Sequence, residues 1–414
     1  VAAVAASRLG RFGILGLLAV STPQLAALGL MVQTETDFSS RLCFVLSWAL
    51  LNFFWLALLR RPALSGALSL TMVVVLVLLS RFKHDVAQMT VNFVDLMVID
   101  RDTVSFLFTI FPDLRWPVIG AGLVTAPLMA ALWWLDPFRI RRLPALALGL
   151  GCLAALTGYS LAYPDEAWRG YYDDGYLSKF TRSGVTAVSD LLRYGFLEAD
   201  ASTTAHLNMP LLDACHPAGR RPNIIMIHDE SSFDIRAASC VKVPAGYGAH
   251  FKSYDGKERK FLAESNGGPS WYTEYNVLAG LSSRSFGRFS YFVTRLASGH
   301  VERGLPRSLR RCGYQTMSVY PAFGGFMSAR DFQTTAGIEH FYDAHDLGAK
   351  EVEPDSFFYD SAVKLMSAQA PGKPLFMFVY LAANHFPWEA KFRPELTPAW
   401  LPPGNVPSID EYLR

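Results

Sequence analysis

The chain has 414 residues, of which 51% are hydrophobic and only 18% are charged. This balance is too apolar for one ordinary soluble protein and too polar for a protein that lies wholly within a membrane. The formal net charge is +2, which gives no reason to expect a nucleic-acid partner. The composition shifts near Tyr163, so we expect a membrane part before that residue and a soluble part after it.

Five apolar stretches in the first part are long enough to cross a bilayer, which takes about 20 residues each. They cover residues 12–32, 42–59, 63–80, 117–135 and 143–163. The first stretch is too long for a signal peptide and lacks the small-residue cleavage pattern. Charged side chains are almost absent from all five, whereas ion and substrate paths usually contain them. The sequence therefore predicts a membrane anchor rather than a transporter.

Arginines between the predicted spans indicate their orientation, because connections rich in Lys and Arg stay in the cytoplasm. Alternate connections carry them: Arg8, Arg11, Arg60, Arg61, Arg139, Arg141 and Arg142. We therefore expect a multi-pass protein of the cell (inner) membrane with a cytoplasmic N-terminus. Five crossings leave residue 164 onward outside, in the periplasm or the extracellular space.

The connection between the third and fourth spans is predicted to hold short amphipathic helices near residues 85–112. Val86–Met97 and Val104–Phe111 carry apolar residues at helical spacing between aspartates. Such helices either lie in the outer membrane interface or cap the helical bundle. Both placements would put them where a lipid substrate reaches the soluble part.

The soluble part is predicted to be an α/β domain over residues 222–414, behind a linker at 164–221 with a helix near 184–197. Ile224–Ile227, Thr316–Tyr320 and Leu375–Leu381 have the β-branched and aromatic content of strands. Helical stretches alternate with them, at Pro306–Cys312 and Asp355–Ala370. Such alternation indicates a parallel sheet covered by helices.

Five cysteines are present, and none forms the close pairs of a zinc ribbon. Outside the cytoplasm a disulfide can form among Cys215, Cys240 and Cys312. Spacing does not fix the connectivity, and the pairing that we expect is Cys215 with Cys240.

Two carboxylates end the first predicted strand. Asp229 and Glu230 directly follow the apolar run that begins at Ile224. Open α/β sheets bind their ligands at the carboxyl ends of the strands. We therefore expect a site here rather than a solvated surface.

A Gly-Gly-Pro turn places Ser270 at the start of a predicted helix, Trp271–Leu281. A serine in this position is most often an N-cap. The same position is also an anion site, where a serine beside a metal-bound carboxylate can attack phosphorus. The local sequence leaves both interpretations open.

Two further residues lie near expected strand ends. Arg330 follows a Gly-Gly turn, and an arginine is either a solvated charge or a bidentate phosphate ligand. His385 follows the strand Leu375–Leu381. A lone histidine is more often structural than catalytic, but this one is well placed for a site.

Together these segments resemble the lipoteichoic acid synthase family within the alkaline phosphatase and sulfatase superfamily. The resemblance covers five spans, a linker and four motifs in order: Asn223–Ser231, Gly268–Leu281, Phe326–Asp343 and Asn384–Pro387. It implies that Glu230 and Ser270 bind metal, with Asp229 as an optional third ligand. It also implies that Ser270 is the nucleophile in place of the family's threonine, with Thr273 in reserve. It also implies that Arg330 and His385 bind substrate.

One part of the family's metal site is missing from the sequence. The family ends its site with an adjacent Asp-His pair late in the domain, and no such pair follows Glu230. Asp343 and His345 have the wrong spacing. We expect the pair beyond Arg414, with the sequence incomplete at its C-terminus.

The resemblance implies a metal-dependent transferase that moves a head group from a phospholipid to an acceptor through a phospho-seryl intermediate. Mn²⁺ is the expected metal, with Mg²⁺ or Zn²⁺ as alternatives. The expected donor is phosphatidylglycerol rather than phosphatidylethanolamine, and the expected acceptor is a glycan or glycolipid. Two other hypotheses are a hydrolase, either phosphodiesterase or sulfatase, and a non-catalytic membrane receptor or assembly protein. Residues 270–274 lack the Cys/Ser-x-Pro-x-Arg pattern of sulfatases.

Overall fold

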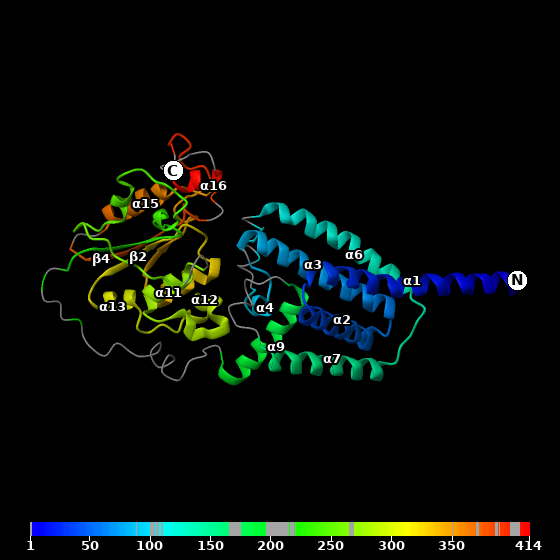
Figure 1. The fold of residues 1–414 in the computed structure, drawn as a ribbon. Coiled ribbons are helices and arrows are strands. Elements are labelled where there is room, and N and C mark those ends of the chain that lie inside the picture. Colours follow the sequence, from blue (N-terminus) through cyan, green and yellow to red (C-terminus); the bar gives the residue numbers. More distant parts are fainter. Residues whose placement is uncertain are drawn as a thin grey trace. The chain divides into compact units, whose positions relative to one another are not determined.

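A computed structural model of the chain consists of two compact units, Val1–Phe196 and Leu197–Arg414. Figure 1 shows the helices of the first unit and the mixed α/β second unit. The structure describes residues 2–87, 89–99, 104, 107–108, 111–164, 175–195, 215, 219, 221–264, 269–350, 352–369, 372–385, 388, 390–397 and 406–414.

Five helices of the first unit are long and apolar enough to cross a membrane. They are α1 (Ala2–Thr34), α2 (Phe38–Leu59), α3 (Pro62–Ala87), α6 (Arg115–Leu135) and α7 (Arg142–Ala162). Each coincides with one of the five predicted spans, so this part of the expected fold class is confirmed. Many of their leucines are exposed, among them Leu17 at 62% and Leu123 at 71%. Such exposure suits a helix that faces lipid rather than water.

The predicted helices of the third connection are realised only in part. The residues up to Ala87 continue α3, and a short helix, α4 (Phe93–Val98), follows. Asn92 begins α4 because its side chain accepts from the backbone N–H groups of Val94 and Asp95. Most of the stretch predicted at Val104–Phe111 lies outside the described residues.

Helix α9 (Leu177–Tyr194) belongs to the first unit, although the sequence placed it in a linker. Glu35, at the end of α1, accepts from the Ser178 hydroxyl at 2.5 Å and from its backbone N–H at 3.3 Å. The hydroxyls of Ser47 and Thr181 join α2 to α9 at 2.7 Å. These buried polar contacts fix α9 against the membrane helices, so the first compact unit extends beyond Tyr163.

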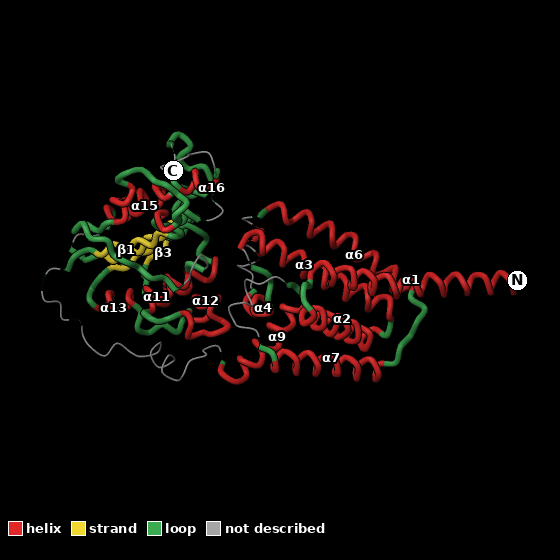
Figure 2. The backbone as a smooth tube through the Cα atoms, viewed as in Figure 1, coloured by secondary structure: helices red, strands yellow, loops and turns green. Residues whose placement is uncertain are grey.

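The second unit is built on a parallel sheet of four strands in the order β1-β4-β2-β3. The strands are β1 (Ile224–Asp229), β2 (Gln315–Val319), β3 (His340–Tyr342) and β4 (Leu375–Leu381), and they are drawn in yellow in Figure 2. The three predicted strands are present and β3 is additional. The parallel pairing confirms the predicted α/β class.

Helices cover both faces of the sheet, because the side chains of β4 alternate between two cores. Phe376, Phe378 and Tyr380 pack with residues of α11 (Trp271–Ala279), α13 (Leu305–Arg311) and α14 (Ala329–Ala336). Leu375, Met377, Val379 and Leu381 pack with α15 (Asp355–Ser367). All seven residues of β4 are buried, as expected for the centre of a parallel sheet. The shorter elements are η1 (Pro112–Leu114), η2 (Ile235–Ala237), η3 (Tyr247–Phe251), η4 (Ser283–Phe292), α12 (Val293–Ala297), η5 (Phe326–Ser328) and α16 (Pro407–Tyr412).

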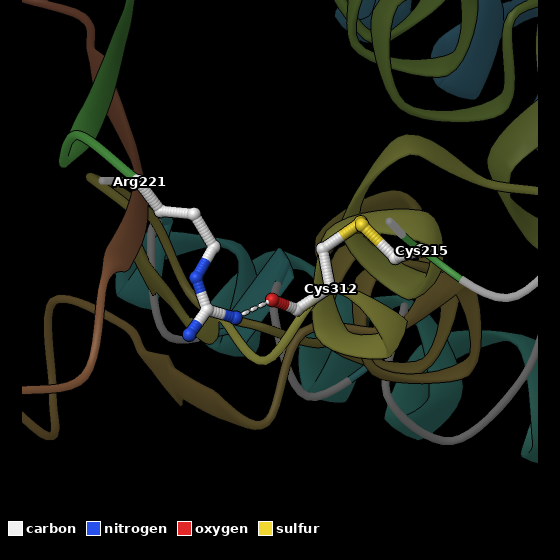
Figure 3. Close-up of a disulfide and its surroundings, with 3 residues drawn as sticks. All are labelled: Cys215, Arg221 and Cys312. Carbon is white, nitrogen blue, oxygen red and sulfur yellow. Dashed lines mark hydrogen bonds between the residues drawn. A yellow bond between two sulfur atoms is a disulfide. The ribbon is translucent and has the colours of Figure 1, made fainter. Parts of the chain in front are cut away.

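A disulfide joins Cys215 to Cys312, so the predicted pairing of Cys215 with Cys240 is wrong. Cys312 ends α13, and its Cα lies 5.0 Å from that of Cys215. The Arg221 guanidinium donates to the Cys312 carbonyl beside the bond (Figure 3). Cys240 is exposed and unpaired. Tertiary packing of α13, rather than nearness in sequence, selects the partner.

Candidate active site

The two carboxylates at the end of β1 belong to opposite faces of the sheet, because side chains alternate along a strand. Asp229 lies on the α15 side, where burial and then the charge of Asp355 oppose its ionisation and its pKa is raised. Glu230 lies on the other side, and its backbone N–H bonds to the Leu381 carbonyl. Ser231, next in the chain, has a positive φ of 58°. Strained backbone of this kind is often retained at functional sites.

Ser270 directly precedes α11, and its hydroxyl is not used to cap the helix. It accepts instead a 2.6 Å hydrogen bond from the phenol of Tyr380 on β4. The simple N-cap interpretation therefore does not account for this side chain. Thr273 also lies in the first turn of α11, as its third residue, and it is Ser270 that bonds to Tyr380. The geometry favours Ser270 over Thr273 as a reactive hydroxyl.

A buried acid that the sequence did not single out as a site residue lies one turn along α11. Glu274 is 0% exposed, and the Gln333 side-chain amide donates to its Oε1 at 2.9 Å. Burial, reinforced by the charge of Glu230, raises the pKa of Glu274 to about 8. Its Oε2 and the Gln333 Oε1 have no hydrogen-bond partner among the described residues. A protonated Glu274 supplies the donor that this pair of oxygens lacks.

Two buried tyrosines complete this side of the site. Burial, followed by the charges of Glu274 and Glu230, raises the pKa of Tyr320 well above its usual value. Burial also raises the pKa of Tyr380 well above its usual value, and the Glu230 charge is the next largest cause. Both phenols therefore remain neutral hydrogen-bond donors, and the Glu230 charge acts on both of them.

His385 lies beside Glu230, as expected for a residue just after β4. Its Nε2 is 3.7 Å from a Glu230 oxygen, and the histidine side chain is 61% exposed whereas that of Glu230 is 12% exposed. The predicted motif continues into Phe386 and Pro387, which lie outside the described residues. The structure thus brings Glu230 and His385 together, with the imidazole on the solvent side.

Arg330 is engaged by carboxylates rather than free in solvent. Its guanidinium lies 2.7 Å from both Asp343 and Asp346 and covers the ring of Phe341. The Asp343 carboxylate also accepts from the Gly324 backbone N–H at 2.9 Å. Arg330 and Asp343 therefore hold the turn after β2 against the end of β3.

The described residues offer two candidate places for a metal. Asp343, His345 and Asp346 have possible ligand atoms within 4.8 Å of one another, but Arg330 already supplies a cation to both carboxylates. Glu230 and Ser270 offer a carboxylate and a hydroxyl, and oxygen donors suit Mn²⁺ or Mg²⁺. Burial, with the Glu230 charge as an additional cause, raises the pKa of Glu274 and of Tyr380. In the described part of the chain, no arginine or lysine forms an ion pair with Glu230. The donor atoms of Glu230 and Ser270 are thus of a kind that suits a divalent cation.

Comparisons with known proteins agree with this architecture. Residues 270–413 match the family model described as Sulfatase. An uncharacterized protein of Haemophilus influenzae is 25% identical over 134 residues, which are 30% of this chain and 24% of that protein. The chain therefore spans about a quarter of that relative's length.

Two solved structures show partial likeness. The lipoteichoic acid synthase LtaP of Listeria monocytogenes is 16% identical over 51% of this chain and 53% of that one, with a TM-score of 0.36. An alkaline phosphatase superfamily protein of Vibrio parahaemolyticus is 15% identical over 48% and 54%, with a TM-score of 0.33. The chain spans about half the length of these structures.

The second unit is an α/β domain in which the Ser270 hydroxyl, at the start of α11, bonds to Tyr380 of the central strand β4. Its residues 270–413 match the Sulfatase family model, in agreement with the superfamily that the motifs resemble. In the chain this domain follows five helices that are long and apolar enough to cross a membrane.

Proposed function

We propose that this protein is a membrane-anchored transferase that moves phosphoglycerol, or phosphoethanolamine, from a phospholipid to a glycan or glycolipid on the extracytoplasmic side of the membrane. The observation that carries this proposal is the uncapped Ser270 hydroxyl at the start of α11, bonded to Tyr380. The arginine pattern of the connections supports an outward-facing second unit.

Ser270 attacks the phosphorus of the lipid phosphodiester in this mechanism. Ser270 loses its hydroxyl proton as a new Oγ–P bond forms, the bond from phosphorus to the diacylglycerol oxygen breaks, and a proton passes to that oxygen. An acceptor hydroxyl then loses its proton and attacks the phospho-seryl group, the Oγ–P bond breaks, and a proton restores the Ser270 hydroxyl. The Tyr380 donor holds the Ser270 oxygen and stabilises negative charge that develops on it. The positive end of the α11 dipole favours the negative charge of the phosphodiester.

Glu230 and Ser270 would hold the divalent cation, for which we propose Mn²⁺. When bound, such a cation lowers the pKa of a hydroxyl and offsets charge on phosphoryl oxygens. His385, exposed beside Glu230, is proposed to bind the polar head group. A direct phosphate contact by Arg330 would require the phosphate to replace Asp346 on the guanidinium.

The test is intact-mass analysis of the full-length protein after incubation with phosphatidylglycerol or phosphatidylethanolamine and Mn²⁺. We expect an adduct on Ser270 whose mass identifies the head group, and its loss in Ser270→Ala. Thr273→Ala is the matched control and should keep the adduct. An adduct that moves to Thr273, or unchanged transfer by Ser270→Ala, would refute the proposed nucleophile.

The same experiment separates the other candidates. Adduct decay by water, without an added acceptor, would indicate a hydrolase. A full-length preparation that binds no metal and forms no adduct would indicate a non-catalytic receptor of the same fold.

A further inference from the structure

One segment of the second unit, residues 252–262, directs large apolar side chains into solvent. Tyr254 is 109% exposed, Phe261 76% and Leu262 92%. The segment is ordered by a bridge between Lys252 and Glu258, which closes a tight turn around Tyr254. Exposed aromatic and leucine side chains grouped in one segment commonly mark a binding surface.

The charge of the 252–262 segment is positive. Its three lysines are all exposed: Lys252, Lys257 and Lys260. Its two acids are engaged by arginines, Asp255 by Arg259 at 2.7 Å and Glu258 by Arg236 at 3.5 Å. Among the described residues no ion pair neutralises the lysines. Apolar side chains flanked by lysines are typical of segments that enter the interface of a bilayer with anionic lipids.

The segment is joined to the helix that follows Ser270. Glu264, two residues after Leu262, accepts from the Asn276 side chain on α11 at 2.9 Å and from the Ser283 backbone N–H at 2.8 Å. The exposed segment is therefore attached to the nucleophile-bearing helix rather than to a remote loop.

We propose that the 252–262 segment inserts Tyr254, Phe261 and Leu262 into the headgroup region of the bilayer that holds the first unit. The three lysines would then contact anionic phospholipids. A lipid surface is favoured over a protein as the binding partner, because the chain's own anchor keeps a bilayer at high effective concentration near the segment. The inference uses the proposed outward topology and goes beyond the proposed reaction. It assigns a membrane-facing side to the second unit.

The test places a fluorophore on this segment in the full-length chain. Leu262→Cys is labelled with nitrobenzoxadiazole after Cys43, Cys152 and Cys240 are replaced by serine, and the protein is reconstituted in nanodiscs of phosphatidylcholine and phosphatidylglycerol. Val352→Cys is the matched control, because Val352 is an apolar residue with 73% exposure outside the segment. We expect lipids that carry a doxyl group on the acyl chain, close to the headgroup, to quench the label at 262 several-fold more strongly than the label at 352.

A second arm tests the charge. Replacing the three lysines by glutamine, or omitting phosphatidylglycerol, should reduce quenching at 262 and leave the value at 352 unchanged. Equal quenching at both positions overturns the proposal. So does a label at 262 that is shielded from aqueous iodide but not quenched by doxyl lipid, because a protein surface would then cover the segment. Neither readout needs substrate or metal, so the result is independent of the proposed reaction.

Discussion

Tyr380 is the residue whose effect on Ser270 can be isolated most directly. Tyr380→Phe removes one hydroxyl from a buried strand and leaves the ring in place. Because that hydroxyl is the donor to Ser270, we expect kcat for head-group transfer to fall by about tenfold with little change in KM. Steady-state kinetics with a lipid donor measure this.

Tyr272→Phe is the control for this change, because the Tyr272 hydroxyl bonds to that of Ser290. It should leave kcat unchanged. Equal losses in the two variants would show that phenol removal acts through general packing.

The buried carboxyl group of Glu274 should make the folding stability of the chain depend on pH. Its pKa is about 8 in the folded chain and 4.5 ordinarily, so only the folded chain keeps the proton between these values. Stability from this group is complete below about pH 4.5 and is lost as the pH rises toward 8. Glu274→Gln stays neutral, and we expect it to raise stability at pH 7 by about 3 kcal/mol.

The measurement is the apparent melting temperature of the full-length protein in detergent across this pH range. Glu302→Gln, at an exposed ion pair with Arg307, is the control and should keep the wild-type slope. A Glu274→Gln profile that falls as steeply as the wild type would contradict a buried proton on Glu274.

The elements at the carboxyl edge of the sheet are connected through Arg330. If its guanidinium reaches phosphate by leaving Asp346, then Asp346→Asn should lower KM for the lipid donor several-fold. Asp343→Asn removes the carboxylate that also holds the Gly324 N–H, so we expect it to lower stability by about 1–3 kcal/mol instead. Kinetics and thermal unfolding of the pair check this. An unchanged KM in Asp346→Asn would assign Arg330 a purely structural role.

The strongest sequence patterns predicted whole elements. Leu375–Leu381 is continuously apolar and is a central strand, and the five long apolar runs are long helices. The strand His340–Tyr342 escaped prediction because three residues at a sheet edge give almost no periodic pattern.

Site residues on separate elements were harder to predict. Ser270 and Glu230 follow local turn and strand-end patterns, whereas Tyr380 is indistinguishable from its apolar neighbours until β4 is placed beside α11. Glu274 and Gln333 are 59 residues apart, and only packing of α11 with α14 joins them. The same limit applies to Arg330, whose partners come from the end of β3.

At the scale of the whole molecule, the predicted orientation can be tested with cysteines. The exposed native Cys240 should react with a membrane-impermeant maleimide in intact cells, or in spheroplasts if an outer membrane is present. A cysteine introduced at Arg139, between α6 and α7, should react only after permeabilisation, because cationic connections stay in the cytoplasm. Labelling at position 139 in intact cells would show that the topology is the opposite of the predicted one.

The bond between Cys215 and Cys312 also bears on how the protein matures. It closes a separation of 97 residues, whereas Cys240 is only 25 positions from Cys215 (240 − 215). Closing the shorter loop in the unfolded chain costs about 1 kcal/mol less, so the non-native pair should form first. The native bond would then arise by thiol–disulfide exchange with Cys312, and a disulfide isomerase should accelerate this step. Removing the Cys240 thiol should therefore make export-linked oxidation faster and less dependent on an isomerase.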